Sequence, residues 1–100
     1  MNDKIILRGD EAIDILQRIE KILISLHNIG SHYRDKSEMD YSLATCRFID
    51  QCGVSEDLAT IRAVISEKFD RSLGDDDMDD IERAMESVSF WECENDISEK

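Results

Sequence analysis

Apolar residues recur along the first third of the chain at the spacing of one helix face. They are Ala12, Ile15, Leu16, Ile19, Ile22, Leu23, Leu26 and Ile29. Steps of three and four residues predict an amphipathic helix over about residues 10–28. Ile13 and Ile24 widen the apolar stripe, so we expect this helix to be central. Asp10 is the expected N-cap, and Gly30 is expected to end the helix in a left-handed C-cap.

The middle of the chain predicts two further helices. Ser37 is placed to cap a helix that runs to about Gln51, and Gly53 is expected to stop it. The apolar stripe of that helix is Tyr41, Ala44, Phe48 and Cys52, with Leu43 and Ile49 beside it. Ser55 is expected to cap the next helix, which Gly74 would end. Its expected buried face is Leu58, Ile61, Val64 or Ile65, Phe69 and Leu73.

A fourth helix is predicted to begin in the acidic stretch LGDDDMDDIERAMESVSFWE and to reach about Trp91 or Glu92. Its stripe is Met78, Ile81, Ala84, Met85, Val88 and Trp91, so Trp91 is expected in the core. The chain has no proline and only four glycines, which favours helices over a turn-rich β-fold. The sequence therefore predicts an all-α protein, a compact antiparallel bundle of about four helices. We expect one domain over residues 1–100, with an N-terminal arm over 1–9 and a frayed tail over 93–100.

The charge is strongly negative and unevenly distributed. The net charge is −12. Residues 1–50 carry nine acids and seven bases, a net of −2, whereas residues 51–100 carry fifteen acids and five bases, a net of −10. Such a field repels nucleic acids and anionic membranes and attracts basic partners. We therefore expect no direct binding of nucleic acid and no membrane association.

The cysteine content and the lengths of the apolar runs indicate the cellular compartment. The three cysteines are an odd number and form no CxxC pair, which favours reduced thiols. Neither a secretory signal nor a transmembrane run is visible. The sequence thus predicts a cytoplasmic protein.

Calcium binding is one interpretation of the acidic stretch. With Asp75 in the first position of an EF-hand loop, acids also fall in the third, fifth and twelfth positions. Asp80 would then occupy the sixth position, where the loop requires glycine. The helical stripe also runs through the supposed loop, so we reject calcium and expect Asp75, Asp76 or Asp77 to cap a helix instead.

The number of acids in this stretch exceeds what a helix start needs. One cap and one or two first-turn acids suffice, and Glu82 with Glu86 forms a like-charge pair at i, i+4. The surplus predicts a surface for a basic partner, with a merely solvated face as the alternative. The candidate acids are Asp75, Asp76, Asp77, Asp79, Asp80, Glu82 and Glu86. Tyr33 and Phe90 are candidate aromatic contacts for the partner. Each is expected either to be an exposed anchor of this kind or to pack within the protein.

The sequence holds no arrangement of residues typical of a catalytic or metal site. No Ser–His–acid signature, phosphate loop or HExxH motif occurs, so we predict that the chain is not an enzyme and needs no cofactor. His27 and His32 are expected on different elements because Gly30 would end the first helix. They are therefore interpreted as polar histidines and not as zinc ligands.

These features together favour an inhibitor that binds a protein. The leading hypothesis is an immunity or antitoxin-type protein that neutralises a basic toxin or nuclease domain by covering its active cleft. The support is analogy of size, charge and helicity with small acidic inhibitors. The alternatives are a DNA-mimic inhibitor and a helical adaptor that self-associates through the broad apolar first helix. The expected oligomeric state is a monomer or a weak homodimer.

Overall fold

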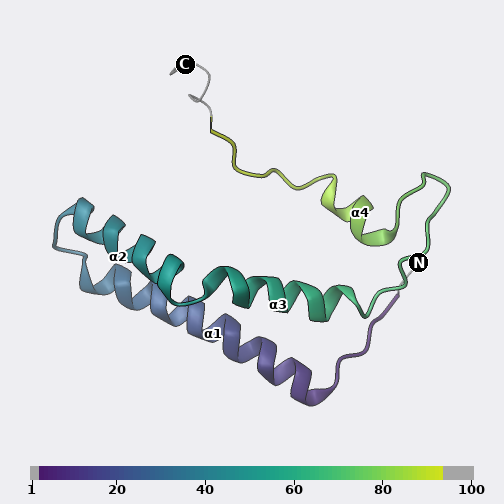
Figure 1. Cartoon of the computed structure of the whole chain (residues 1–100), viewed down its shortest axis with the longest axis horizontal. Helices are drawn as coiled ribbons and strands as arrows, with labels where there is room; N and C mark the ends of the chain where they lie inside the picture. Colours follow the sequence, from purple (N-terminus) through teal and green to yellow (C-terminus); the bar gives the residue numbers. More distant parts are fainter. Residues whose placement is uncertain (1–2, 94–100) are drawn as a thin grey trace. The chain divides into compact units, whose positions relative to one another are not determined.

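The chain is all-helical over the residues that the structure describes. The structure is a computed structural model that describes residues 3–93, and it contains no strand in that range. The helices are α1 (Gly9–His32), α2 (Glu38–Gln51), α3 (Val54–Ser66) and α4 (Asp80–Met85) (Figure 1). The three long helices, α1, α2 and α3, pack against one another. The prediction of a small all-α helical bundle is confirmed.

The structure divides the chain into two compact units. The first, here called the helical unit, is residues 4–68 and contains α1, α2 and α3. The second, here called the C-terminal unit, is described over Asp3 and residues 69–93 and contains α4. The expectation of a single domain stays a prediction. Residues 1–2 of the expected arm and residues 94–100 of the expected tail lie outside the described residues.

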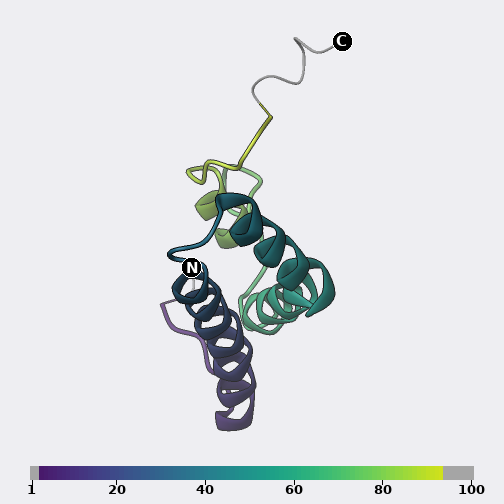
Figure 2. The ribbon, with the colours of Figure 1, turned by 90° about the vertical axis from the view of Figure 1, so that its left-hand side faces the viewer.

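The helical unit is built along α1. α2 and α3 follow one another along its length and run antiparallel to it (Figure 1), and the turned view shows both on the same side of α1 (Figure 2). Gly53 separates these two helices with a left-handed backbone, at φ 70°. Residues with a Cβ adopt this conformation at a cost, so glycine suits the bend. The predicted stop at Gly53 is confirmed.

α1 is longer than its sequence pattern predicts. It begins at Gly9 with Arg8 as N-cap, so the prediction of Asp10 as N-cap is wrong. Glu11 accepts a hydrogen bond from the Arg8 backbone N–H at 3.0 Å, which satisfies one of the free donors at the helix start. The helix also continues through Gly30, because one glycine costs a helix only about 1 kcal/mol. The predicted left-handed C-cap at Gly30 is therefore wrong.

The boundaries of α2 and α3 are predicted unequally well. Ser37 caps α2 as predicted, and its Oγ accepts a hydrogen bond from the Asp40 backbone N–H at 3.0 Å. α3 instead follows directly from the bend, with Val54 as its first residue, so the cap predicted at Ser55 is wrong. α3 ends at Ser66 and does not extend to Leu73, whose side chain is exposed.

An ion pair accompanies the end of α3. Lys68 Nζ lies 2.7 Å from Glu11 Oε2, and both side chains are largely covered. The pair lowers the pKa of Glu11 and raises that of Lys68. It ties the end of α3 to the start of α1.

The helical unit has a small apolar core. Among its described side chains, only Ile15 and Val54 are hydrophobic and buried, at 6% and 7% exposure. A charged cluster adds to the contact between α1 and α3. Asp57 is buried and lies 2.8 Å from Arg18 Nη1 and 2.7 Å from Lys21 Nζ. Helix packing in this unit thus depends on ion pairs as well as on apolar contact.

α4 is a short helix of six residues. The prediction that Asp75, Asp76 or Asp77 caps it and that it reaches about Trp91 or Glu92 is wrong, because Asp79 caps it and it ends at Met85. A helix this short needs packing or caps to persist, and the side chains that follow it are exposed. The prediction of Trp91 as a core residue is also wrong, because it is 86% exposed. Within the described range, no helix has the length and apolar character needed to cross a membrane.

Candidate protein-binding site in the C-terminal unit

A closed loop precedes α4 and contains the first acids of the run. The Gly74 N–H donates to the Met78 carbonyl at 2.8 Å, and the Asp77 N–H donates to the Gly74 carbonyl at 3.1 Å. Asp77 has a left-handed backbone with φ 62°, which aspartate tolerates better than most residues. Residues 74–78 therefore form a turn and not the first turn of a helix.

Arg83 holds this loop against the start of α4. Its Nε and Nη2 both donate to the Asp76 carboxylate at 2.8 Å, a bidentate pair. Its Nη1 donates to Asp80 at 2.9 Å, and its Nη2 also donates to the Met78 carbonyl at 3.0 Å. The Arg83 guanidinium lowers the pKa of Asp76 well below its usual range, and the two carboxylates raise the pKa of Arg83. We call Asp76, Asp80 and Arg83 the arginine clasp.

Asp79 caps α4 and is the most buried acid of the run, at 4% exposure. Its Oδ1 accepts the Glu82 backbone N–H at 2.8 Å, and Glu82 accepts the Asp79 N–H at 3.0 Å. This reciprocal pair is a capping box. Arg71 Nε donates to Asp79 Oδ2 at 2.6 Å. The Glu82 N–H and then Arg71 lower the pKa of Asp79.

Local structure therefore accounts for four of the seven candidate acids. Asp76 and Asp80 belong to the arginine clasp, and Asp79 and Glu82 form the capping box. The side chains of Asp75, Asp77 and Glu86 are exposed and make no hydrogen bond or ion pair within the described part of the chain. We call these three the free acids. They are the carboxylates with no local role in the structure, so they are the ones most available to a partner.

Exposed apolar side chains follow the acidic run. Met85 and Val88 are about half exposed, Phe90 is 69% exposed and Trp91 more so. Phe90 was predicted as a candidate contact, whereas Trp91 was assigned to the core. Large aromatic side chains close to charged ones are typical of protein-binding surfaces. The C-terminal unit thus offers both chemical components of an interface within residues 75–91.

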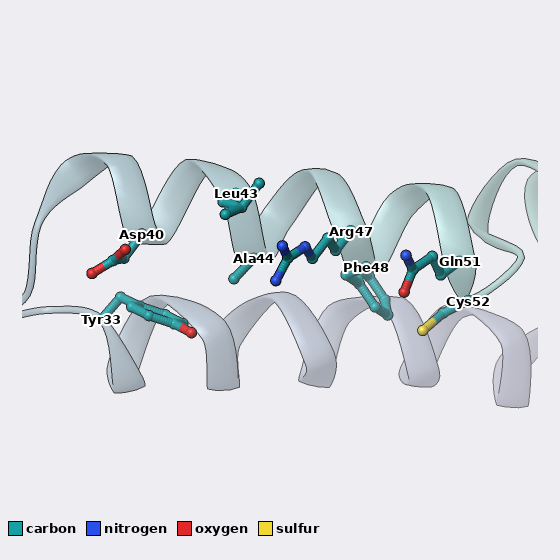
Figure 3. A pocket seen from close by; sticks show the side chains of 8 residues that line it. All are labelled: Tyr33, Asp40, Leu43, Ala44, Arg47, Phe48, Gln51 and Cys52. Atoms are coloured by element: carbon teal, nitrogen blue, oxygen red, sulfur yellow. The ribbon is translucent and has the colours of Figure 1, made fainter.

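Tyr33, the other candidate aromatic, belongs to the helical unit. It is the C-cap of α1, and its ring meets the ring of His32 edge to face with centroids 4.7 Å apart. It lines a pocket of about 420 Å³ beside α2 (Figure 3). The other lining residues are Asp40, Leu43, Ala44, Arg47, Phe48, Gln51 and Cys52. The half-buried Tyr33 therefore packs within its own unit.

Metal binding can now be considered from the geometry. The sequence argument against calcium assumed a continuous helix, and the turn at residues 74–78 shows that this assumption is wrong. Asp79, which would be the ligand in the fifth position, uses both carboxylate oxygens in protein contacts. His27 and His32 lie on the same helix, contrary to prediction, but five positions apart, which puts them on different faces. Over the described residues, no group of three or more potential ligands gathers.

Reasoning from sequence missed two residues of the site and misassigned the role of a third. Arg71 and Arg83 are the only basic residues between Phe69 and Cys93, and each pairs with an acid of the run. Asp79 was counted as surplus charge. The signal for it was present, because Asp79 and Glu82 have the spacing of a capping box. Comparison with known protein families, curated proteins and solved structures gave no match.

Proposed function

We propose that the chain is a small acidic inhibitor that binds a basic protein. In this proposal it is an immunity or antitoxin-type protein that neutralises a toxin or nuclease domain. One observation carries the proposal: the free acids and the exposed Phe90 and Trp91 occur together in the C-terminal unit. In this proposal the chain acts by occupying a cleft and not by catalysis. The carboxylates would take the place of phosphates in a basic cleft, and the aromatic rings would supply buried contact area.

The charge distribution supports this assignment. Residues 69–100 carry twelve acids and three bases, a net of −9, whereas residues 4–68 carry eleven acids and nine bases, a net of −2. A concentrated negative field speeds the encounter with a basic surface. The arginine clasp and the capping box hold the loop in one shape, so less conformational entropy is lost when a partner binds.

The test compares two variants with equal changes in net charge. The first neutralises the free acids as Asp75→Asn, Asp77→Asn and Glu86→Gln. The control neutralises three exposed acids of the helical unit as Glu20→Gln, Asp35→Asn and Asp50→Asn. The wild-type protein and the control should recover the same basic protein from lysate of the native host, and the free-acid variant should recover much less of it. Equal recovery by all three proteins would contradict the proposed site.

Purified partner then tests the electrostatic and inhibitory parts. The association rate should fall steeply as salt is raised, since screening shortens the reach of the acidic field to ~8–10 Å at physiological ionic strength. The wild-type chain should also suppress the toxic or nuclease activity of the partner at a one-to-one ratio. A salt-independent association rate, or a complex in which the partner stays fully active, would rule out this function.

A further inference from the structure

The helical unit carries an apolar surface that the proposed function does not use. Leu16, Leu23 and Leu26 of α1 are exposed, although they belong to the stripe that was predicted to be buried. Leu16 and Leu23 are 54% and 56% exposed. Ile13 and Ile24, also exposed, extend the surface on one side. The contacts with α2 and α3 therefore leave part of the apolar face of α1 uncovered.

The exposed leucines belong to a regular seam along α1. The seam comprises Ala12, Leu16, Ile19, Leu23, Leu26 and Gly30, and we call it the α1 seam. Its steps alternate between four and three residues. This is the heptad spacing by which one helix packs along another. Ile15, Ile22 and Ile29 recur every seven residues on the adjacent face, and they are buried or half-buried within the unit. In the α1 seam, by contrast, the three leucines are exposed, and Ala12, Ile19 and Gly30 are half-buried.

We propose that a second copy of this chain covers the α1 seam in an antiparallel α1–α1 dimer. The sizes of the seam residues support this occupant, because they read small, large, large, large, large, small from Ala12 to Gly30. An antiparallel copy therefore sets Ala12 against the partner's Gly30 and Leu16 against the partner's Leu26. A two-fold interface requires such self-complementarity. The antiparallel arrangement also places the positive end of each helix beside the negative end of the other.

The net charge of the helical unit permits this contact, and the small area of the α1 seam limits its strength. The helical unit has a net charge of only −2, so two copies repel each other weakly through these faces. From Ala12 to Gly30 the seam is about 27 Å long, and a helix is ~10–12 Å wide, which gives roughly 300 Å² per copy. A standard stable interface needs about 800 Å² per partner. The dimer should therefore be reversible, with a dissociation constant of roughly micromolar to submillimolar.

Sedimentation equilibrium of the full chain tests the dimer from about 1 μM to about 1 mM. The wild-type protein should pass from monomer to dimer in this range. Leu16→Glu with Leu23→Glu should raise the dissociation constant at least tenfold. Leu58→Glu is the matched control, because Leu58 is exposed to a similar degree, 52%, but lies on α3, so it should leave the constant unchanged. Circular dichroism confirms that each variant is folded.

Disulfide trapping tests the orientation. The exposed Cys46, Cys52 and Cys93 are first replaced by serine. A mixture of Ala12→Cys and Gly30→Cys proteins should then form the mixed disulfide dimer faster than either protein crosslinks with itself. Faster crosslinking of Ala12→Cys with itself would overturn the antiparallel arrangement.

Two further outcomes would show that a second copy of the chain does not cover the α1 seam. One is a wild-type protein that stays monomeric over the whole concentration range. The other is a dimer that survives Leu16→Glu with Leu23→Glu unchanged. If the chain is monomeric and these two substitutions instead abolish binding of the basic partner, the α1 seam belongs to that partner. The free-acid variant separates the two proposals, because it should lose the partner and keep the dimer.

Discussion

A single guanidinium determines the shape of the acidic loop. Arg83 donates to Asp76, to Asp80 and to the Met78 carbonyl, which joins three points of the chain within eight residues. The planar fork of arginine matches a carboxylate with two parallel hydrogen bonds, which lysine cannot reproduce. The acids of this stretch are therefore partly structural, and their number overstates the charge that is free to attract a partner.

The pKa of Asp76 gives the first prediction. Arg83 holds this pKa below the ordinary value for aspartate, ~3.9. A depressed pKa means that the clasp stabilises the fold above pH ~4. The stabilisation is lost as the pH falls through the folded-state pKa. NMR titration of the Asp76 carboxyl carbon should give a midpoint clearly below 3.9.

Arg83→Gln is the control for this titration. It should return the Asp76 midpoint towards 3.9, because the bidentate partner is gone. A midpoint that is the same in the wild-type protein and in Arg83→Gln would show that Arg83 does not set the Asp76 pKa.

At the scale of elements, two glycines of the helical unit have opposite roles. Gly30 lies inside α1 with open space where a Cβ would stand. Gly53 has φ 70°, and a Cβ there would lie 3.3 Å from Glu56 Oε1. The same substitution should therefore have opposite effects at the two positions.

The second prediction compares Gly30→Ala with Gly53→Ala. Gly30→Ala should stabilise the protein by about 0.5–1 kcal/mol, because alanine is the better helix former. Gly53→Ala should destabilise it by roughly 1–2 kcal/mol, because of its left-handed backbone. Urea denaturation at low protein concentration, where the proposed dimer dissociates, measures both effects. Equal shifts in the same direction would contradict the assigned backbone at Gly53.

The third prediction concerns the ion cluster that links α3 to α1. Asp57 is buried between Arg18 and Lys21, and Lys21 followed by Arg18 lowers its pKa. Asp57→Asn should cost roughly 1–3 kcal/mol, because two cations lose a charged partner. Asp50→Asn, at an exposed position of α2, is the control and should stay within about 0.5 kcal/mol. If both substitutions have equally small effects, the cluster contributes little to the packing of α3 on α1.

At the scale of the whole molecule, the packed helices and most of the negative charge belong to different units. The helical unit contains the three long helices and is nearly neutral, whereas the C-terminal unit contains one short helix and most of the net negative charge. Lys68 pairs with Glu11 within the helical unit, and Arg71 pairs with Asp79 within the C-terminal unit. The two units can therefore be tested separately.

The fourth prediction is that residues 1–68 fold without the rest of the chain. The fragment should keep the helical circular dichroism of α1, α2 and α3, since the contacts among these helices lie within it. Its amide hydrogens in α1 should exchange at rates close to those of the full chain. A fragment with the spectrum of an unfolded peptide would show that the helical unit depends on residues 69–100.

Sequence periodicity predicted that the helices exist. It predicted less well where they begin and end and which of their apolar side chains are buried. α2 was predicted within one residue, because Ser37 and Gly53 are strong local signals. α4 was predicted too long because its apolar period continues to Trp91, and a period does not reveal whether a neighbour covers it. The clasp escaped prediction for a related reason: Arg83 finds Asp76 seven positions away, through a turn that no helical spacing describes.

The exposure of Trp91 has a practical consequence, because it is the only tryptophan of the chain. Its fluorescence reports on residues close to the proposed interface without any label. The free protein should emit at the long wavelengths of a hydrated indole, and burial by a partner should shift the emission to shorter ones. Relative to a neutral tryptophan derivative, the neighbouring acids should raise collisional quenching by caesium and lower quenching by iodide. The ratio of the two quenching constants then measures the local negative potential directly.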